Sequence, residues 1–180
     1  MKLVRLTGAG LVLAAASLVH AQSGGSGYVD GAMFRALIDE DQEIIEVNLE
    51  GPILQALAKS KGENMEDSKD LFAKLKAIHA VIGTVKGPAS EAMDLVRRTD
   101  AKLVGQGWQR ITRIKDESST ISVLTHTVGD RVDGLVALIF DADDKELVFA
   151  NLAGEIDITR LGEIGDQLNV PGLDHVPGAR

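Results

Sequence analysis

Apolar positions in this chain follow two spacings, one typical of strands and one typical of helices. Continuous or alternating runs of aliphatic and β-branched residues predict strands over residues 43–49, 78–85, 108–115, 120–128, 135–140 and 147–152. Every residue of 135–140 is apolar, as in a strand that is covered on both faces. An acidic turn separates this strand from the next, so residues 135–152 are predicted to form a hairpin.

Helical spacing of apolar residues recurs between these strands. The predicted helices begin at or near Asp30, Pro52, Ser68, Ser90 and Asp157. In the helix capped by Ser90, the apolar face carries one charged residue, Asp100. The last helix, capped by Asp157, has its inward stripe at Ile158, Leu161, Ile164 and Leu168.

The helix predicted over residues 30–41 has an apolar face made by Met33, Phe34, Leu37 and Ile38. Such a face either packs on its own domain or binds a partner, and we expect the first. Residues 22–27 before it are Gln, Ser and Gly only, which is the composition of a flexible linker.

Helices early in the chain and consecutive strands late in it predict an α+β fold. We expect a mostly antiparallel sheet of about six strands with helices packed on one face. Residues 43–173 are predicted to form this single domain. Residues 22–42 form a linker and N-terminal helical segment before the domain, and residues 174–180 form a C-terminal tail after it.

The first residues have the three regions of a secretory signal peptide. Lys2 and Arg5 give a positive start, residues 6–19 are apolar and small, and Ala21 is a small residue at the expected cleavage point. A transmembrane anchor is the alternative, but about 14 apolar residues span only about 21 Å of a hydrocarbon core of about 30 Å. We expect cleavage after Ala21, leaving a periplasmic or secreted protein with no membrane anchor.

The composition of the chain excludes several kinds of site and argues against some classes of partner. The chain has no Cys, which excludes disulfides, thiol catalysis and Cys-based zinc sites. Its net charge of −8 would become −10 on loss of Lys2 and Arg5. This balance argues against nucleic-acid binding and against electrostatic docking on anionic lipid.

The acidic turn at Asp141, Asp143 and Asp144 is the cluster most similar to a metal site, because calcium prefers oxygen ligands. It lacks the calcium-loop pattern, since Lys145 and Glu146 follow where a Gly would make the turn. A solvated hairpin turn is therefore the favoured interpretation. Weak calcium binding remains the alternative.

Candidate catalytic residues are sparse. There is no Gly-x-Ser-x-Gly motif, His79 and His126 fall within predicted strands, and His175 lies in the tail. Trp108 with Arg110 and Arg113 could form a stacking surface, but core packing of the one Trp is the simpler interpretation. We assign no catalytic residue, metal ligand or cofactor.

Five short motifs together resemble a family of exported bacterial proteins called domain of unknown function 4252. They are Val47-Asn48-Leu49-x-Gly51-Pro52, Gly107-Trp108, Gly134-Leu135, Asn151-Leu152-x-Gly154-x-Ile156-Asp157 and Pro171-Gly172-Leu173. The resemblance implies an exported α+β domain without an established activity. It also implies a link to envelope-sensing sigma-factor systems, and hence to a regulatory or stress role. It supplies no catalytic residues.

These observations favour a non-enzymatic protein that binds another envelope component, whose identity the sequence does not give. Two alternatives remain. One is an exported hydrolase that uses carboxylates such as Asp141, Asp143 or Glu155, which requires two carboxylates facing each other in a concave site. The other is a small-ligand carrier, which requires an apolar cavity between helices and sheet.

Overall fold

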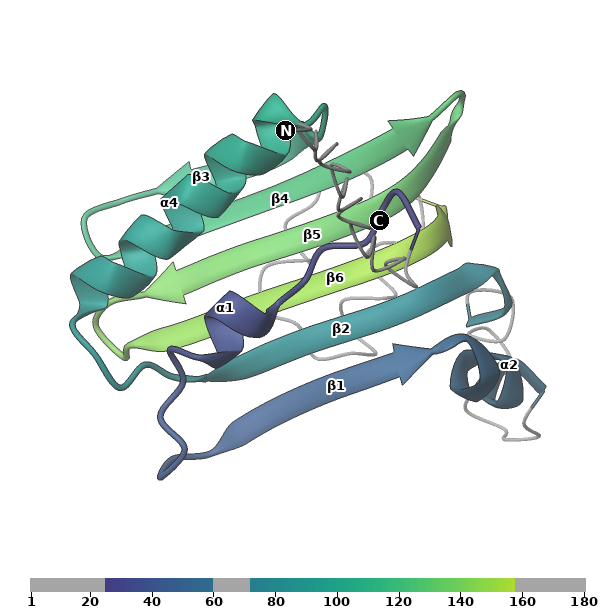
Figure 1. Cartoon of the computed structure of the whole chain (residues 1–180). Coiled ribbons are helices and arrows are strands. Elements are labelled where there is room, and N and C mark those ends of the chain that lie inside the picture. Colours follow the sequence, from purple (N-terminus) through teal and green to yellow (C-terminus); the bar gives the residue numbers. More distant parts are fainter. Residues whose placement is uncertain (1–24, 60–71, 158–180) are drawn as a thin grey trace, which may run out of the picture.

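The structure is a computed structural model that describes residues 25–59 and 72–157 (Figure 1). Six strands make one sheet: β1 (Ile44–Glu50), β2 (Leu75–Thr84), β3 (Gln109–Lys115), β4 (Ser119–Val128), β5 (Arg131–Asp141) and β6 (Glu146–Ile156). The helices are α1 (Ala32–Arg35), α2 (Gly51–Lys59) and α4 (Ala89–Gly105). The expected signal peptide, the last helix and the C-terminal tail lie outside the described residues.

The sheet has the order β1-β2-β6-β5-β4-β3, and every neighbouring pair is antiparallel. β6, the last strand in the chain, therefore lies between β2 and β5 at the centre of the sheet. Its residues are buried almost throughout, which agrees with its apolar sequence. The predicted α+β class and the mostly antiparallel six-stranded sheet are confirmed.

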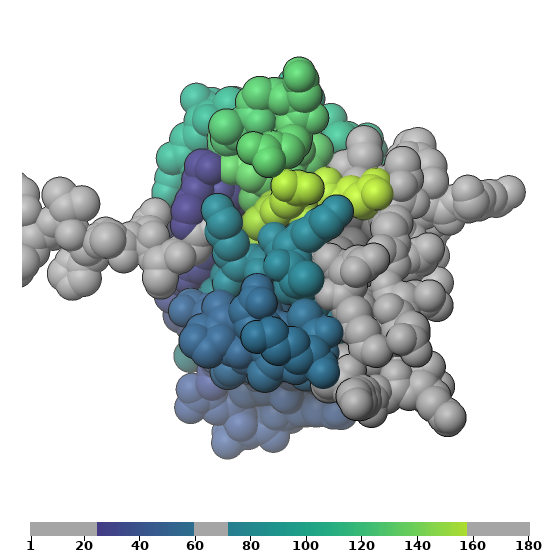
Figure 2. Space-filling view, turned by 90° about the vertical axis from the view of Figure 1, so that its right-hand side faces the viewer, coloured from purple at the N-terminus to yellow at the C-terminus, as the bar shows by residue number. Residues whose placement is uncertain are grey.

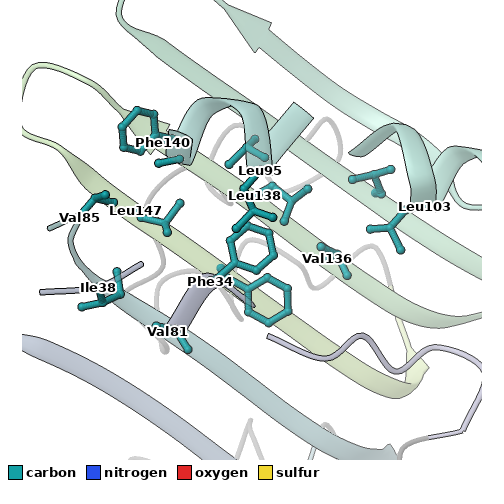
Figure 3. Packing of buried hydrophobic residues seen from close by; sticks show 14 of the residues in the cluster. Phe34, Ile38, Val81, Val85, Leu95, Leu103, Val136, Leu138, Phe140 and Leu147 are labelled. Atoms are coloured by element: carbon teal, nitrogen blue, oxygen red, sulfur yellow. The ribbon is translucent and has the colours of Figure 1, made fainter. Parts of the chain in front are cut away.

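One face of the sheet, here called the helix face, is covered by α4, α1 and the segment that precedes α1 (Figures 1 and 3). The aromatic rings of Phe34 and Phe149 stack there with centroids 4.8 Å apart, which joins α1 to β6. Leu103 from α4 and Leu138 from β5 belong to the same buried cluster. This cluster forms because alternate strand residues point to the same face.

The opposite face, here called the far face, carries the other set of alternate strand residues. It includes a row of small residues, Ala80, Ala150 and Ala137, all buried. Leu54 of α2 packs in this cluster. The expected packing of helices on one face thus holds for α1 and α4, whereas α2 contacts the far face near β1 and β2.

Several predicted boundaries differ from the observed ones. The N-terminal helix is only the four residues of α1, although Phe34 and Ile38 pack on the domain as expected. α4 starts after Pro88, and Ser90 is not its cap. The last strand extends beyond its predicted end at residue 152, and Gly154 sits within β6 at φ +133°, where a Cβ atom would come within 2.7 Å of Leu75 Cα. Only glycine allows the two strands to approach so closely.

The largest difference concerns residues 25–31, here called the strap. Its sequence begins Gly-Ser-Gly, which predicted a flexible linker, but in the structure it runs over β5 and β6 on the helix face (Figure 1). Gly27 is buried against the backbone of Asp133 and Gly134. The strap is therefore part of the folded domain, and it forms one wall of the site described next.

Candidate ligand-binding groove

Asn151 holds the strap to the centre of the sheet. Its side chain is fully buried, and its Oδ1 accepts a hydrogen bond of 2.9 Å from the backbone N–H of Val29. Its Nδ2 donates bonds of 3.0 Å to the carbonyl oxygens of Gly27 and Leu135. One buried amide thus satisfies backbone groups of both the strap and β5, which a buried polar side chain must do to be stable.

Gly27 brings the strap into direct backbone contact with β5. A Cβ atom on Gly27 would lie 1.9 Å from the carbonyl oxygen of Asp133, and one on Gly134 would lie 2.6 Å from Gly27 Cα. Both positions therefore require glycine for steric reasons. This close contact places Ser26 beside the carboxylate of Asp133.

Asp133 accepts hydrogen bonds from two groups. The hydroxyl of Ser26 donates to Oδ2, and Nδ1 of His126 lies 2.6 Å from Oδ1. Burial alone would raise the pKa of Asp133, but the bonds from Ser26 and His126 outweigh burial and lower the pKa below its usual range. The charged carboxylate therefore ties the strap to β4 and β5.

A groove of about 590 Å³ lies between the strap and the C-terminal half of α4. Leu103 and Trp108, both buried, are apolar residues of its lining. The ring of His126 also lines the groove, and its centroid lies 5.2 Å from that of the Trp108 ring. Exposed polar side chains line it from both sides, with Asp30 on the strap and Lys102 on α4. The groove thus has a mixed lining of apolar and polar residues, which includes one positive side chain, Lys102, and one negative side chain, Asp30.

Gly107 explains how Trp108 reaches this groove. Its φ of +95° turns the chain at the end of α4, and the N–H of Trp108 then donates to the carbonyl of Leu103 at 3.1 Å. This left-handed turn is a common way to end a helix, and it favours glycine. Trp108 is core-packed, as the simpler interpretation predicted, but it also borders the groove.

An ion pair fixes α4, the other wall of the groove, to the sheet. Asp100 accepts hydrogen bonds from the guanidinium of Arg110 on β3 and from the hydroxyl of Ser122 on β4. Burial would raise the pKa of Asp100, but these bonds lower it below the usual range. The charged residue on the predicted apolar face of this helix is therefore a buried attachment point.

Ser26, Asp133 and His126 do not form a hydrolytic triad. In such a triad the imidazole lies between the nucleophile and the carboxylate, so that it can take the proton of the nucleophile. Here the carboxylate of Asp133 lies between Ser26 and His126. Ser26 bonds to a carboxylate and is not paired with the ring that would activate it.

The acidic residues singled out in the sequence lie elsewhere. Asp141 Oδ1 accepts the backbone N–H groups of Asp143 at 2.9 Å and Asp144 at 3.4 Å, which confirms the predicted hairpin turn. Lys145 completes this turn with φ +54°. In the described part of the chain, no group of three or more His, Asp or Glu side chains is close enough to hold a metal ion.

Glu155 is far from that turn. Glu146, next to the turn, is the first residue of β6, and Glu155 lies near the other end of the same strand. The nine residues from Glu146 to Glu155 correspond to about 30 Å along a strand. Its carboxylate pairs with Arg131 at 3.2 Å and with Lys74 at 3.8 Å. Glu155 and Asp141 therefore do not face each other as the two carboxylates of a hydrolase would.

The remaining predicted candidates are also placed. His79 lies in β2, where its ring meets the edge of Tyr28 with centroids 5.0 Å apart and its Nε2 is 3.4 Å from Glu50. Arg113 is exposed on β3, and His175 lies outside the described residues. None of the helices within residues 25–59 and 72–157 is long and apolar enough to cross a membrane.

Comparison with known proteins identifies the family. The family model "Domain of unknown function (DUF4252)" matches residues 35–164, which is most of the chain. The chain belongs to the DUF4252 family. No curated protein and no solved structure matches it. The DUF4252 match includes Asp100, Trp108, His126, Asp133 and Asn151, whereas the strap precedes it.

Proposed function

We propose that this DUF4252 protein is an exported, non-enzymatic binding protein that holds a small polar ligand in the groove between the strap and α4. The groove carries this proposal. Its volume of about 590 Å³ falls within the range of about 300–1,000 Å³ typical of small-molecule sites. Its lining mixes apolar side chains with polar groups on both walls, and polar groups at defined positions fix the orientation of a ligand in such sites.

The charged side chains of the groove suggest the chemistry of the ligand. Lys102 offers a positive charge on one wall, and Asp30 offers a negative charge on the other. With Nδ1 of His126 directed at Asp133, the other ring nitrogen is the one left for a ligand. Opposite charges on opposite walls fit a zwitterion, so free amino acids and short peptides are the ligands that we propose.

The arrangement of Ser26 and Asp133 supports binding in preference to hydrolysis. The Ser26 hydroxyl is used to hold the strap, and the two ends of β6 keep Glu155 apart from Asp141. An exported hydrolase would need an activated nucleophile or two facing carboxylates. The structure thus provides a ligand-sized groove, a Ser26 hydroxyl without an activating base, and a Glu155 that does not face Asp141.

A thermal-shift screen tests the proposed function. Purified protein is heated with free amino acids, dipeptides and monosaccharides in turn, and a ligand that binds only the folded state raises Tm. We expect a rise with amino acids or dipeptides that is reduced in Lys102→Ala. The matched variant is Arg98→Ala, an exposed cation of the same helix that does not line the groove. A rise that Lys102→Ala leaves unchanged would argue against this groove.

Export is a separate part of the proposal and rests on the sequence of residues 1–21. Expression of the full chain in a bacterium, fractionation of the cells and N-terminal sequencing of the protein test it. We expect mature protein in the periplasm or medium that begins at Gln22. Protein that retains Met1 and stays in the cytoplasm would contradict export and would leave the groove proposal untouched.

A further inference from the structure

The two edges of the sheet differ in whether they can accept another strand. β3 has a register irregularity between Arg110 and Thr112, and it carries Arg113 and Lys115. Bulges and basic residues are the usual means by which an edge strand avoids pairing with other chains. The β3 edge is therefore protected.

β1 has none of these features. Its seven residues pair with β2 in an unbroken register from Ile44 opposite Gly83 to Glu50 opposite Ala77. Its side chains include no Lys, Arg or Pro, and Ile45 is 46% exposed. In Figures 1 and 2 no described segment lies beyond the outer edge of β1, which is at the bottom of both views. Among the residues that the structure describes, β1 thus presents an open row of backbone hydrogen-bonding groups.

Glu46, one of the two carboxylates of β1, is paired within the chain, and the other, Glu50, lies beside a histidine. Glu46 accepts a hydrogen bond of 2.9 Å from Nε of Arg35, and Glu50 lies 3.4 Å from Nε2 of His79. These contacts lie on the helix face, whereas Val47 and Leu49 point to the far face. These contacts do not prevent another strand from approaching β1, but setting one carboxylate directly opposite another would still destabilise a strand pair.

We propose that β1 pairs with β1 of a second copy of this chain, antiparallel and with Val47 at the two-fold axis. This register uses all seven residues and places Ile45 opposite Leu49 on the far face, where both are apolar. Glu46 then lies opposite Asn48, which can accept or donate hydrogen bonds. The two sheets join into one continuous sheet of twelve strands.

Neighbouring registers are excluded by charge. A two-fold axis at Asn48 would place Glu46 opposite Glu50, and an axis at Glu46 would place that carboxylate opposite itself. Like charges directly opposite one another destabilise a strand pair. A single strand pair buries less than the roughly 1,200–2,000 Å² of a standard interface, so the dimer should dissociate on dilution.

Sedimentation equilibrium of the purified protein tests this pairing. We expect the mass to double as concentration rises, and we expect Asn48→Glu to remain monomeric because it sets a carboxylate against Glu46 of the second copy. Gln109→Glu adds the same charge to the exposed β3 edge and should still dimerise. The double variant Asn48→Glu with Glu46→Lys should regain the dimer through two opposite-charge pairs.

Cysteine crosslinking tests the register directly, because the chain has no Cys. Facing residues of antiparallel strands have Cα atoms about 4.5–5.5 Å apart, which a disulfide can bridge. Val47→Cys should therefore form a disulfide dimer on oxidation. In Asn48→Cys, the cysteine of one copy faces residue 46 of the other copy and not the second cysteine. The Cα atoms of the two cysteines are then about 8 Å apart, so they should not crosslink. A protein that stays monomeric at all concentrations, equal crosslinking of both variants, or loss of the dimer in Gln109→Glu would overturn the proposal.

Discussion

The backbone N–H of Val29 donates a hydrogen bond of 2.9 Å to Oδ1 of Asn151, which is 122 residues further along the chain. The bond joins the strap to the central strand of the sheet, and Asn151 is fully buried where it forms. This bond, the one from Asn151 to the Gly27 carbonyl and the one from Ser26 to Asp133 fix the strap through long-range polar contacts. The groove depends on these contacts because the strap is one of its walls.

Replacing Asn151 with Ala should destabilise the protein by about 3 kcal/mol. The substitution removes the partner of the Val29 N–H and of the Gly27 carbonyl, and unsatisfied buried groups cost about 1–3 kcal/mol each before partial relaxation. Urea unfolding measures the change. Gln109→Ala, at an exposed position of β3, is the control and should change the free energy of unfolding by less than about 0.5 kcal/mol. Equal effects of the two variants would contradict the role of Asn151.

Adding one methyl group to the strap should also be costly. In Gly27→Ala the new Cβ would lie 1.9 Å from the Asp133 carbonyl oxygen, so the strap or β5 must move. Overpacking of this kind costs about 1–3 kcal/mol, and we expect the upper part of that range because the obstacle is backbone. Gly51→Ala is the matched control, since nothing lies within 4 Å of its added Cβ. A Gly27→Ala protein as stable as Gly51→Ala would show that the strap is not packed as described.

Strand periodicity predicted most of the sheet. Residues 43–49 and 120–128 were expected as strands, and β1 and β4 are Ile44–Glu50 and Ser119–Val128. Alternation is a local property, so a single sequence reveals it. The order of the strap was not predicted, because its composition is that of a linker. The strap is ordered by the buried side chain of Asn151 and by the close contact of Gly27 with Gly134, both far from it or from each other in sequence. Such contacts leave no local periodicity.

Asp100 makes a pH-dependent contribution to stability. Its pKa is lowered in the folded protein by the bonds from Arg110 and Ser122, which outweigh the effect of burial. A lowered pKa means that the stabilisation is complete above the unfolded value of about 3.9 and is lost as pH falls through the lower folded value. Asp100→Asn should therefore cost about 2 kcal/mol at neutral pH. The cost should shrink toward zero in strong acid.

Urea unfolding of wild type and Asp100→Asn at a series of pH values from neutral to strong acid measures how the cost of the substitution changes with pH. The control is Asp94→Asn, which removes an exposed ion pair with Arg97 on the same helix. Exposed pairs contribute about 0–1 kcal/mol, so its effect should be small at either pH. A cost for Asp100→Asn that does not depend on pH would contradict the ionised pair.

The acidic turn should not bind calcium at millimolar concentration. Asp141 already accepts two backbone N–H groups within the turn, and the described residues place no third carboxylate ligand close enough to complete a site. Calcium titration by calorimetry should give only heats of dilution. A saturable heat that disappears in Asp143→Asn would contradict this prediction.

The candidate site was only partly predictable. Asp100 was visible as the charged exception on an apolar helical face, but its partner Arg110 follows a turn whose direction depends on Gly107. Gly107-Trp108 and the Asn151 motif were noticed through the family resemblance, without a structural reason for them. The structure supplies that reason: one motif ends α4 beside the groove, and the other holds the strap.

Fluorescence of Trp108 tests the central claim most directly, because the protein has a single Trp and that residue lines the groove. Purified protein is titrated with free amino acids and dipeptides in turn while the Trp emission is recorded. We expect a saturable change with at least one of these ligands, lost or weakened at least tenfold in Lys102→Ala and retained in Arg98→Ala. The absence of any change up to millimolar concentration, or an equal change in both variants, would contradict a zwitterion-binding groove between the strap and α4.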